Sequence, residues 1–499
     1  MLFENTSKFF VLFQKIFVWT DSKIENSFSR RLNSLTNRFT LSSTEFNGPS
    51  ILIAVKAPLW VKSLNVKPYS SGKTITWKLP PSKSHAIRTL FLASQSQDSV
   101  EILGVSNSGH DVNSMKNCLL QLGVKMEKLD FQGNLNPLGK ELIGSEIHSI
   151  IIHGVGVNGF IKPEEKLDVG NSGTTLRLIS VLCSRFDFEV IIDGDVTMRS
   201  RDTKSLWDSM TCSGVKVSYL HEEYRLPVKV HGPWFSDGQI RKLVIDVSKS
   251  SQPISAWILS SSGLESELEI EFSGVPVSNR HWLLSMEICN SNGADIVLRD
   301  NRLNIKPWSI TTKPTMEVPK DASMASFAML AASYLKVPVK LIGWPDRTQC
   351  IGHEILFDIS KDLGITWHEF SLVKSTSSSS IEVDITNCND IITPLSLMLA
   401  AASGGNITGA SHASFKESNR LKTTKQLFES FGMKCELIGD GLSIPGNQIP
   451  VSPDKLVHTF GDHRVFMSAY ILACSVGADV EGSGLHKIAD AKFIERISA

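Results

Sequence analysis

The sequence has no excess of charge of either sign. Lys and Arg together number 51, as do Asp and Glu, so no global field favours nucleic acid, and any anion site must be built locally. The eight cysteines are scattered without a CxxC pair or other metal-ligand spacing, which argues against a zinc site and fits a reducing compartment. The apolar stretch at residues 9–19 is too short to span a bilayer, and Lys15 interrupts it. We therefore expect no nucleic-acid partner, no membrane partner and no metal.

The length of 499 residues, with 41% hydrophobic and 20% charged residues, is enough for two or more ordinary globular domains. Residues 1–65 differ in composition, because residues 21–50 are rich in Ser, Thr and Asn with three arginines. We expect an N-terminal extension over 1–65 that is either disordered or a targeting segment. An organellar transit peptide is one reading, although acidic residues within the stretch count against it.

A repeated pattern runs through the rest of the chain. An amphipathic helical stretch, a Gly followed by an apolar residue, and a short strand-like run recur at Gly123, Gly214, Gly293, Gly364 and Gly432. A second series of Ala/Leu/Ser-rich helices interleaves with the first. It starts near Lys83, Asn171, Ser250, Asp321, Asp390 and Asp462. The pattern predicts six similar α/β units of about 70–90 residues, grouped as two sets of three.

Two clusters of basic residues lie at the start of predicted helices. Ser84 and Arg88 are four residues apart and share a helical face, and Lys83 stands at the start of this helix. Lys416 and Arg420 are also four residues apart. Cations beside the free N–H groups of a helix start suit a phosphate or carboxylate. The alternatives are a capped helix with solvated charges for the first cluster and surface ion pairs for the second.

Other polar groups lie at equivalent points of the remaining units. Two glycines flank Asn171-Ser172, which lets the backbone approach an anion closely, although the same residues are common in turns. Asp390 precedes an apolar helix, where it is either functional or an N-cap. Equivalent helices with such starts would direct their positive ends to one cleft.

Taken together, the elements Ser-Lys-Ser-x-x-x-Arg, Gly-Asn-x-Gly-Thr, Ser-Ser-Gln, Lys-Glu-x-x-Arg and Asp-His-Arg resemble those of the 5-enolpyruvylshikimate-3-phosphate synthases. The resemblance covers about 66–499, in order. It implies an α/β, two-lobed enolpyruvyl transferase fold with six βαβαββ repeats arranged as two three-repeat lobes. One lobe would be 82–317 (repeats 1–3), and the other 66–81 plus 320–499 (repeats 4–6).

The resemblance also implies roles for individual residues. Catalysis would fall to Asp390, Glu417 and Lys83, with Asp390 as the base and the other two as candidates for proton delivery. The implied ligands of shikimate 3-phosphate are Lys83, Ser84, Arg88, Ser250, Ser251, Asp390 and Lys416. The implied ligands of phosphoenolpyruvate are Lys83, Asn171, Gly173, Arg201, Gln252, Arg420, Arg464 and Lys487.

The implied reaction transfers the enolpyruvyl group of phosphoenolpyruvate to the 5-hydroxyl of shikimate 3-phosphate through a tetrahedral ketal, releasing phosphate. It needs no metal or organic cofactor, and the chain would act as a cytoplasmic monomer, or in a plastid if residues 1–65 are a transit peptide. Two alternatives are a UDP-N-acetylglucosamine enolpyruvyl transferase and a non-catalytic anion-binding paralogue. The first normally has a reactive-loop cysteine and an N-terminal Lys-Asn pair, which are not evident here.

The sequence departs from the family pattern at several positions. His412 stands where many members carry Asn, and Asn419 replaces the usual Asp. The segment containing Arg280 aligns poorly with the part that contacts shikimate in the family. Whether His412 and Arg280 contact a substrate is therefore left open by the sequence. None of these changes removes an implied catalytic carboxylate or cation.

Overall fold

The computed structural model describes residues 62–141, 143, 147–235, 241–376 and 379–498. The extension expected over 1–65 lies almost entirely outside these residues. Within the described ranges, no helix is both long and apolar enough to cross a membrane.

The third repeat shows the unit from which the fold is built. Its elements are β11 (Lys242–Asp246), α8 (Gln252–Ser260), β12 (Leu268–Ser273), α9 (Asn279–Asn290), β13 (Ile296–Arg299) and β14 (Arg302–Ile305). β11 pairs in parallel with β12, and β14 pairs antiparallel with both β12 and β13. Side chains of β12 alternate between buried and partly exposed, as expected for a strand with one covered face. The unit is therefore βαβαββ, as expected.

The second and fifth repeats have the same strand order, β7-β8-β10-β9 and β19-β20-β22-β21. The second comprises β7 (Leu167–Asp168), α5 (Gly173–Cys183), β8 (Glu189–Asp193), α6 (Val196–Arg199), α7 (Lys204–Cys212), β9 (Lys216–Tyr219) and β10 (Val228–His231). The fifth comprises β19 (Ile381–Asp384), η4 (Asn389–Ile391), α12 (Ile392–Ala401), β20 (Gly404–Thr408), η5 (Ser411–Phe415), α13 (Arg420–Ser430), β21 (Glu436–Ile438) and β22 (Gly441–Pro445).

The first, fourth and sixth repeats take a strand from a distant part of the chain. The first contains α3 (Lys83–Ser94), β3 (Ser99–Leu103), α4 (His110–Gln121), β4 (Lys125–Asp130), β5 (Leu135–Pro137) and β6 (Ile147–His153), completed by β15 (Thr315–Glu317). The fourth contains η2 (Ala322–Met324), α10 (Ala325–Leu335), β16 (Val339–Ile342), η3 (Arg347–Gln349), α11 (Ile355–Asp358), β17 (Ile365–His368) and β18 (Ser371–Lys374), completed by β2 (Ile75–Lys78). The sixth contains α14 (His463–Val476), β23 (Ala478–Glu481), η6 (Leu485–Ile488) and α15 (Phe493–Ser498), completed by β1 (Ser63–Val66).

The registers of these borrowed strands show how the chain is interleaved. β15 lies parallel to β3, with Thr315 opposite Glu101, and β2 lies parallel to β16. β1 pairs antiparallel with β23, with Ser63 opposite Glu481. The first described strands therefore complete sheets that are otherwise made by the C-terminal repeats.

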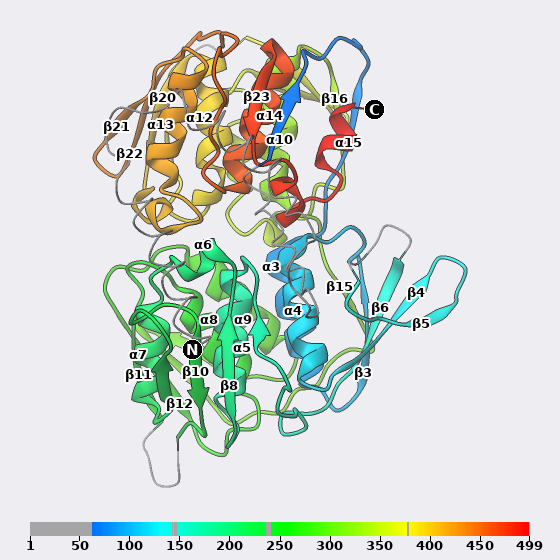
Figure 1. The fold of residues 1–499 in the computed structure, drawn as a ribbon, viewed down its shortest axis with the longest axis vertical. Coiled ribbons are helices and arrows are strands. Elements are labelled where there is room, and N and C mark those ends of the chain that lie inside the picture. Colours follow the sequence, from blue (N-terminus) through cyan, green and yellow to red (C-terminus); the bar gives the residue numbers. More distant parts are fainter. Residues whose placement is uncertain (1–61, 142, 144–146, 236–240, 377–378, 499) are drawn as a thin grey trace, which may run out of the picture. The chain divides into compact units, whose positions relative to one another are not determined.

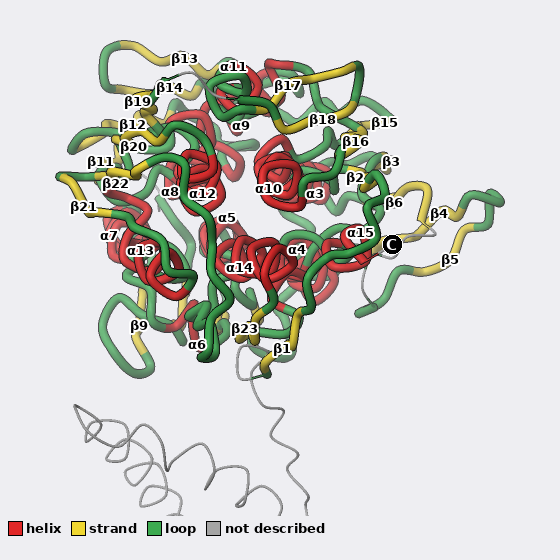
Figure 2. The backbone as a smooth tube through the Cα atoms, turned by 90° about the horizontal axis from the view of Figure 1, so that it is seen from above, coloured by secondary structure: helices red, strands yellow, loops and turns green. Residues whose placement is uncertain are grey.

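Two separate hydrophobic cores form the two lobes. One core draws its residues from 86–318, and the other from 66–79 together with 324–497. Helices α3, α5 and α8 lie in the first lobe and α10, α12 and α14 in the second (Figure 1). These helices are largely buried along their length, and Figure 2 shows the helices gathered centrally with most strands outside them.

The starts of the six buried helices agree with the sequence prediction. α3 begins at Lys83, α5 at Gly173 and α8 at Gln252. In the other lobe, short 3₁₀ turns lead into α10 and α12, and α14 begins at His463. Asp462 caps α14, because its carboxylate accepts hydrogen bonds from the N–H groups of the first turn.

The glycines predicted to end the interleaved helices adopt the left-handed conformation. Their φ angles lie between +65° at Gly364 and +104° at Gly293, a region that favours glycine at a helix C-terminus. The helix expected before Gly364 is, however, only the single turn α11. Ile351 and Gly352 both have positive φ, which prevents a helix from starting earlier.

The chain passes between the lobes at two segments that lie side by side. Pro81 and Lys320 form an isolated antiparallel bridge. The N–H of Ser82 donates to the carbonyl of Pro319 at 2.8 Å, and the N–H of Asp321 donates to the carbonyl of Pro80 at 2.9 Å. Both connections therefore share one short stretch of backbone pairing.

The dependence of the second lobe on residues near the start of the described chain can be tested at β2. Trp77 is fully buried there and packs edge-on against Phe493, with ring centroids 5.7 Å apart. We expect Trp77→Ala to lower the free energy of unfolding by about 3–5 kcal/mol, measured by urea denaturation. The neighbouring exposed change Thr76→Val should alter it by no more than about 0.5 kcal/mol. Equal effects of the two changes would contradict this packing.

Candidate active site

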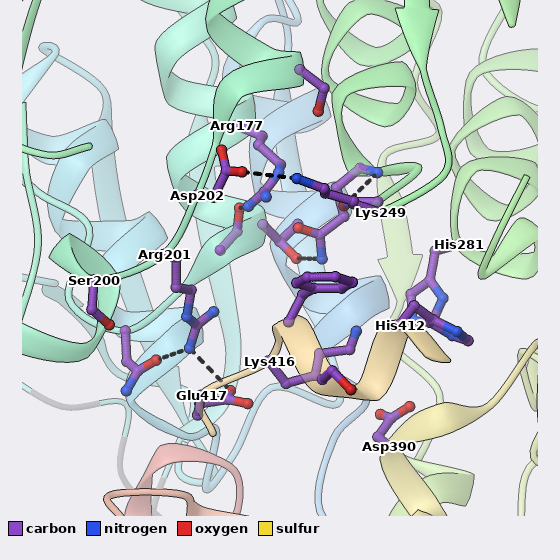
Figure 3. Close-up of a pocket in the computed structure, with 18 of the residues that line it drawn as sticks. Arg177, Ser200, Arg201, Asp202, Lys249, His281, Asp390, His412, Lys416 and Glu417 are labelled. Carbon is purple, nitrogen blue, oxygen red and sulfur yellow. Dashed lines mark hydrogen bonds and ion pairs between the residues drawn. The ribbon is translucent and has the colours of Figure 1, made fainter. Parts of the chain in front are cut away.

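A cavity of about 380 Å³ lies where the buried helices of both lobes begin. The first lobe contributes the starts of α3, α5 and α8. The second lobe contributes η4, η5, the segment before α13, and α14. The cavity is therefore surrounded by helix N-termini and by cationic side chains, an environment that favours anions. Figure 3 shows side chains from both lobes turned towards it.

Glu417 is held among cations from both lobes. Its Oε2 accepts a hydrogen bond from Nη2 of Arg420 at 2.5 Å, and its Oε1 lies 3.4 Å from Nη2 of Arg201 in the other lobe. Burial alone would raise the pKa of Glu417, but the charges of Arg420 and Arg201 hold it well below its usual range. Glu417 is therefore an anion that joins the two lobes electrostatically.

Arg420 is fixed from its other side by Asp462. Its Nε donates to Oδ2 of Asp462 at 2.8 Å, and Asp462 is completely buried. Glu417, Asp462 and His463 could in principle hold a metal ion, since their ligand atoms lie within 4.8 Å of one another. The Arg420 guanidinium already donates to both carboxylates, so the three residues do not fit a cation site.

Asp390 forms a second anionic centre, on the opposite side of Lys416 from Glu417 (Figure 3). Its Oδ2 accepts from Nη2 of Arg464 at 2.9 Å, and Oδ1 faces Nε2 of His353 at 3.6 Å. Burial would raise the pKa of Asp390, but Arg464 and His353 hold it well below its usual range. Asp390 is thus ionised and presents a carboxylate to the cavity.

Two lysines complete the charge pattern. Burial lowers the pKa of the Lys416 ammonium to about 8. Within the part of the chain that the structure describes, this ammonium makes no ion pair. Lys83, at the start of α3, instead pairs with Asp111 at 3.0 Å. Lys416 is consequently a cavity-lining cation that can pair with an incoming anion.

Gly173 allows polar groups of the first lobe to converge. A Cβ at this position would lie 3.0 Å from Nη1 of Arg177, 3.3 Å from Nη1 of Arg201 and 3.5 Å from Oε1 of Gln252. Arg201 also donates to Oδ1 of Asn171 at 2.5 Å. Any side chain at Gly173 would therefore occupy the space around which these polar groups are arranged.

The sequence profile of a family described as EPSP synthase (3-phosphoshikimate 1-carboxyvinyltransferase) matches residues 72–491. The chain belongs to the EPSP synthase family. Membership makes it an enolpyruvyl transferase of the shikimate pathway. The resemblance inferred from its motifs is thereby confirmed.

Individual relatives support the family assignment over most of the chain. The 3-phosphoshikimate 1-carboxyvinyltransferase of Caldicellulosiruptor saccharolyticus is 27% identical over 419 residues, covering 80% of this chain and 89% of the relative. A solved EPSP synthase from Acinetobacter baumannii superposes with a TM-score of 0.66 at 20% identity, covering 87% of this chain and 97% of its own. The enolpyruvyl transferase NikO from Streptomyces tendae gives a TM-score of 0.63 at 13% identity, covering 87% and 96%. The two-lobed enolpyruvyl transferase fold is confirmed.

Most of the site residues implied by the EPSP synthase resemblance line the cavity. They are Lys83, Ser84, Asn171, Gly173, Arg201, Ser250, Gln252, Asp390, Lys416, Glu417, Arg420 and Arg464. Residues far apart in the sequence are thus brought together by the two lobes.

Three implied ligands do not line the cavity. Arg88 is completely buried behind it and donates to Ser285 Oγ and to backbone and hydroxyl oxygens of α3, α8 and α9. Ser251 is also buried, and its hydroxyl donates to the carbonyl of Ser278 at 3.1 Å. Lys487 lies exposed in η6. In this structure Arg88 and Ser251 therefore support the walls of the cavity.

The cavity contains residues that the motifs alone did not single out. Arg177 lies one turn after Gly173 and donates to its carbonyl at 2.8 Å. Its signal was the i,i+4 spacing already noted for Ser84 and Arg88. Lys249 forms an ion pair with Asp202 at 3.0 Å, and its position directly before the Ser-Ser-Gln element would have indicated it.

The sequence left open whether His412 and Arg280 contact a substrate, and the structure places these two residues differently. His412 lines the cavity, and neither ring nitrogen has a hydrogen-bond partner among the described residues. Burial lowers its pKa to about 4, so the ring is neutral near pH 7. Arg280 does not line the cavity and lies 3.9 Å from Glu354. His412 is therefore the better placed of the two to meet a ligand.

Proposed function

We propose that the cavity binds shikimate 3-phosphate and phosphoenolpyruvate together and transfers the enolpyruvyl group to the 5-hydroxyl of shikimate 3-phosphate. The observation that carries the proposal is the placement of two ionised carboxylates, Asp390 and Glu417, in one cavity among cations from both lobes. The two substrates bring phosphates and carboxylates, so such cations match their charge. The carboxylates supply the proton transfers that the reaction needs.

We assign shikimate 3-phosphate to the side of the cavity formed by α3, the start of α8, and Asp390. Lys83, Ser84 and Ser250 would hold its phosphate, and Lys416 and Asp390 would meet its ring substituents. These side chains line one cavity, and they are hydrogen-bond donors apart from Asp390, which is ionised. Arg88 and Ser251 would act from behind the wall by fixing α8 and α9.

We assign phosphoenolpyruvate to the region where Gly173 leaves space. Its cations would be Arg201, Arg420 and Arg464, with Lys83 shared between the two substrates. Asn171 and Gln252 would add neutral polar contacts. Lys487 lies outside the cavity in this structure, so its contact with phosphoenolpyruvate stays a prediction.

In the proposed chemistry, Asp390 takes the proton of the 5-hydroxyl while Lys83, or Glu417 once it has taken up a proton, delivers one to the methylene carbon. The resulting tetrahedral ketal then expels phosphate. Arg464 beside Asp390 keeps this carboxylate ionised until it takes the proton, and the cations of the cavity stabilise negative charge on the leaving phosphate. Contact between the lobes, as at Arg201 and Glu417, would exclude water from these steps.

We further propose lobe boundaries at 82–317 and at 66–81 plus 320–499. The two hydrophobic cores, which draw on 86–318 and on 66–79 with 324–497, support this division. The proposed working form is a cytoplasmic monomer. Placement in a plastid would require residues 1–65 to act as a transit peptide.

Release of phosphate tests the reaction directly. The purified chain should release phosphate when both shikimate 3-phosphate and phosphoenolpyruvate are present, and not with either alone, as measured by a coupled phosphate assay. Replacing the acceptor by UDP-N-acetylglucosamine should give no release. Release with that acceptor would favour the first alternative function. Binding of both substrates by folded protein without turnover would favour the non-catalytic paralogue.

Asp390 can be tested without removing the partner of Arg464. Asp390→Asn retains an oxygen that accepts from the buried guanidinium but is not a base. We expect kcat to fall by at least about 100-fold, while the dissociation constant for shikimate 3-phosphate, measured by calorimetry, changes only a few-fold. Unchanged turnover would contradict the role of Asp390 as base.

The lowered pKa of Lys416 predicts a pH dependence of binding. Below pH 8 the ammonium is charged, whereas above it the free protein must take up a proton to present that charge. The dissociation constant of shikimate 3-phosphate should therefore rise above pH 8, by up to about tenfold per pH unit. Because arginine stays charged, Lys416→Arg should remove this rise.

The control for the Lys416 prediction is the exposed Lys422, two residues into α13. Lys422→Arg should keep the wild-type pH dependence. Wild-type affinity that stays constant between pH 7 and 10 would show that Lys416 is not the binding cation.

A further inference from the structure

His353 faces Asp390 from behind the cavity wall. It lies just before α11, is 4% exposed, and does not line the cavity. Its Nδ1 lies 2.8 Å from the carbonyl oxygen of Cys350, and its Nε2 lies 3.6 Å from Oδ1 of Asp390. The imidazole therefore connects a backbone carbonyl to the carboxylate assigned as the base.

The carbonyl of Cys350 fixes the tautomer of the neutral ring. A carbonyl oxygen can only accept, so Nδ1 of His353 must carry the proton and donate it. In the neutral ring Nε2 then has a lone pair, which points at another acceptor, the carboxylate of Asp390. Nε2 is buried and has no hydrogen-bond partner among the described residues. The pair thus has a place for one additional proton between the two groups.

Asp390 has its other oxygen occupied by Arg464. This contact stabilises the ionised carboxylate, so protonation of Asp390 is unfavourable. The pKa of His353 is raised, because interaction with Asp390 outweighs the burial that would lower it. A proton that reaches Asp390 is therefore held better on the imidazole.

We propose that His353 is a positioning residue for Asp390 that receives, through the carboxylate, the proton removed from the acceptor hydroxyl. The proposal rests on the assignment of Asp390 as the base. It goes beyond that assignment because His353 touches neither substrate and belongs to none of the motifs that indicated the site.

The proposed proton path balances with the transfer reaction. The O–H bond of the acceptor breaks, and its proton passes to Asp390 and on to Nε2 of His353. The oxygen forms a bond to the central carbon of phosphoenolpyruvate, while the electron pair of the C=C double bond takes a proton from Lys83 or protonated Glu417, so the methylene carbon becomes a methyl group. This leaves an imidazolium beside a carboxylate. When phosphate departs with the electron pair of its C–O bond, the methyl carbon returns its proton to the group that supplied it. His353 then returns its proton through Asp390 to water as the products leave.

Several charged or titratable groups surround the pair and affect the pH at which it takes up a proton. They are Arg464 on α14, Asp321 before η2, His281 on α9, His412 in η5, and Lys416 before α13. His281 and His412 have lowered pKa values of about 3 and 4, chiefly through burial. These two rings stay neutral near pH 7, so His353 is the member of this histidine group whose pKa is raised, through its interaction with Asp390.

His353→Asn provides the main test. The amide can still donate to the carbonyl of Cys350 but has no group at the position of Nε2. We expect kcat to fall by about 10–100-fold, with the KM of each substrate within about threefold of wild type. In the wild-type protein, kcat should rise with pH through a pKa above 6.5, because only the neutral ring accepts a proton. This rise should be absent in His353→Asn.

A matched control is available in β6. The ring of His153 likewise has an oxygen partner on Nδ1, Ser99 Oγ at 2.9 Å, and a carboxylate on Nε2, Glu127 Oε2 at 2.8 Å. It lies outside the cavity. His153→Asn should leave kcat and its pH profile unchanged. If His353→Asn binds shikimate 3-phosphate normally and keeps both the wild-type kcat and its acidic limb, the proposal is wrong.

A second measurement is made first on the wild-type protein, so its main result does not depend on the fold of a variant. In wild-type protein with ¹⁵N-labelled histidine, Nε2 of His353 should be unprotonated at high pH and gain a proton with a pKa above 6.5. Asp390→Asn should lower that pKa. A ring protonated on Nε2 at every pH would overturn the proposal. Failure of the proposed function is distinguishable, because wild-type protein would then release no phosphate.

Discussion

The paired backbone of residues 79–82 and 318–321 is the constraint on which the two-lobed arrangement depends. Each segment ends a strand of one lobe and leads to a helix of the other, and the two are joined by hydrogen bonds between Ser82 and Pro319 and between Asp321 and Pro80. Because α3 begins directly after the first segment, and η2 after the second, this pairing sets where helices from both lobes meet. The cavity can therefore include groups from both lobes.

Charge inside that cavity is balanced by specific pairs and not by the chain as a whole. Arg420 lies between Glu417 and Asp462, and Arg464 lies against Asp390. Each of these three carboxylates has a guanidinium beside it, which offsets the cost of burial. Lys416 differs, since burial lowers the pKa of its ammonium to about 8 and no carboxylate among the described residues forms an ion pair with it. An anion that binds beside it would supply the missing compensation.

The repeat pattern made the fold largely predictable from the sequence. Glycine at a helix end and polar groups at a helix start have local physical causes, so the six units and their helix starts could be located without neighbours in space. The exchange of β1, β2 and β15 was less accessible, because strand pairing over such distances depends on the whole fold. Only the membership of the strand near 66–81 in the C-terminal lobe could be inferred, and that came from the family resemblance.

The sequence pattern placed some residues at the cavity where the structure has them, but not others. Helix starts place Lys83, Gly173 and Arg464 at the cavity, because a residue at the end of a buried helix faces the gap between lobes. Arg88 follows the same spacing rule, but its helix is buried on every side, so its guanidinium reaches α8 and α9 instead of the cavity. His353 belongs to no motif, and only the fold brings it to Asp390.

The strands β1 and β2 also determine the order in which the two lobes can be completed during synthesis. Residues 82–317 form a continuous stretch that contains its own core, so this lobe can assemble as soon as it has left the ribosome. β1 and β2 emerge before it, yet β2 pairs with residues 339–342 and β1 with residues 478–481. β2 must therefore wait, unpaired, until residues 339–342 have been synthesised, and β1 until nearly the whole chain has been synthesised. The lobe that carries Asp390 and Glu417 is completed last, so both carboxylates take their final places only after the opposite wall of the cavity already exists.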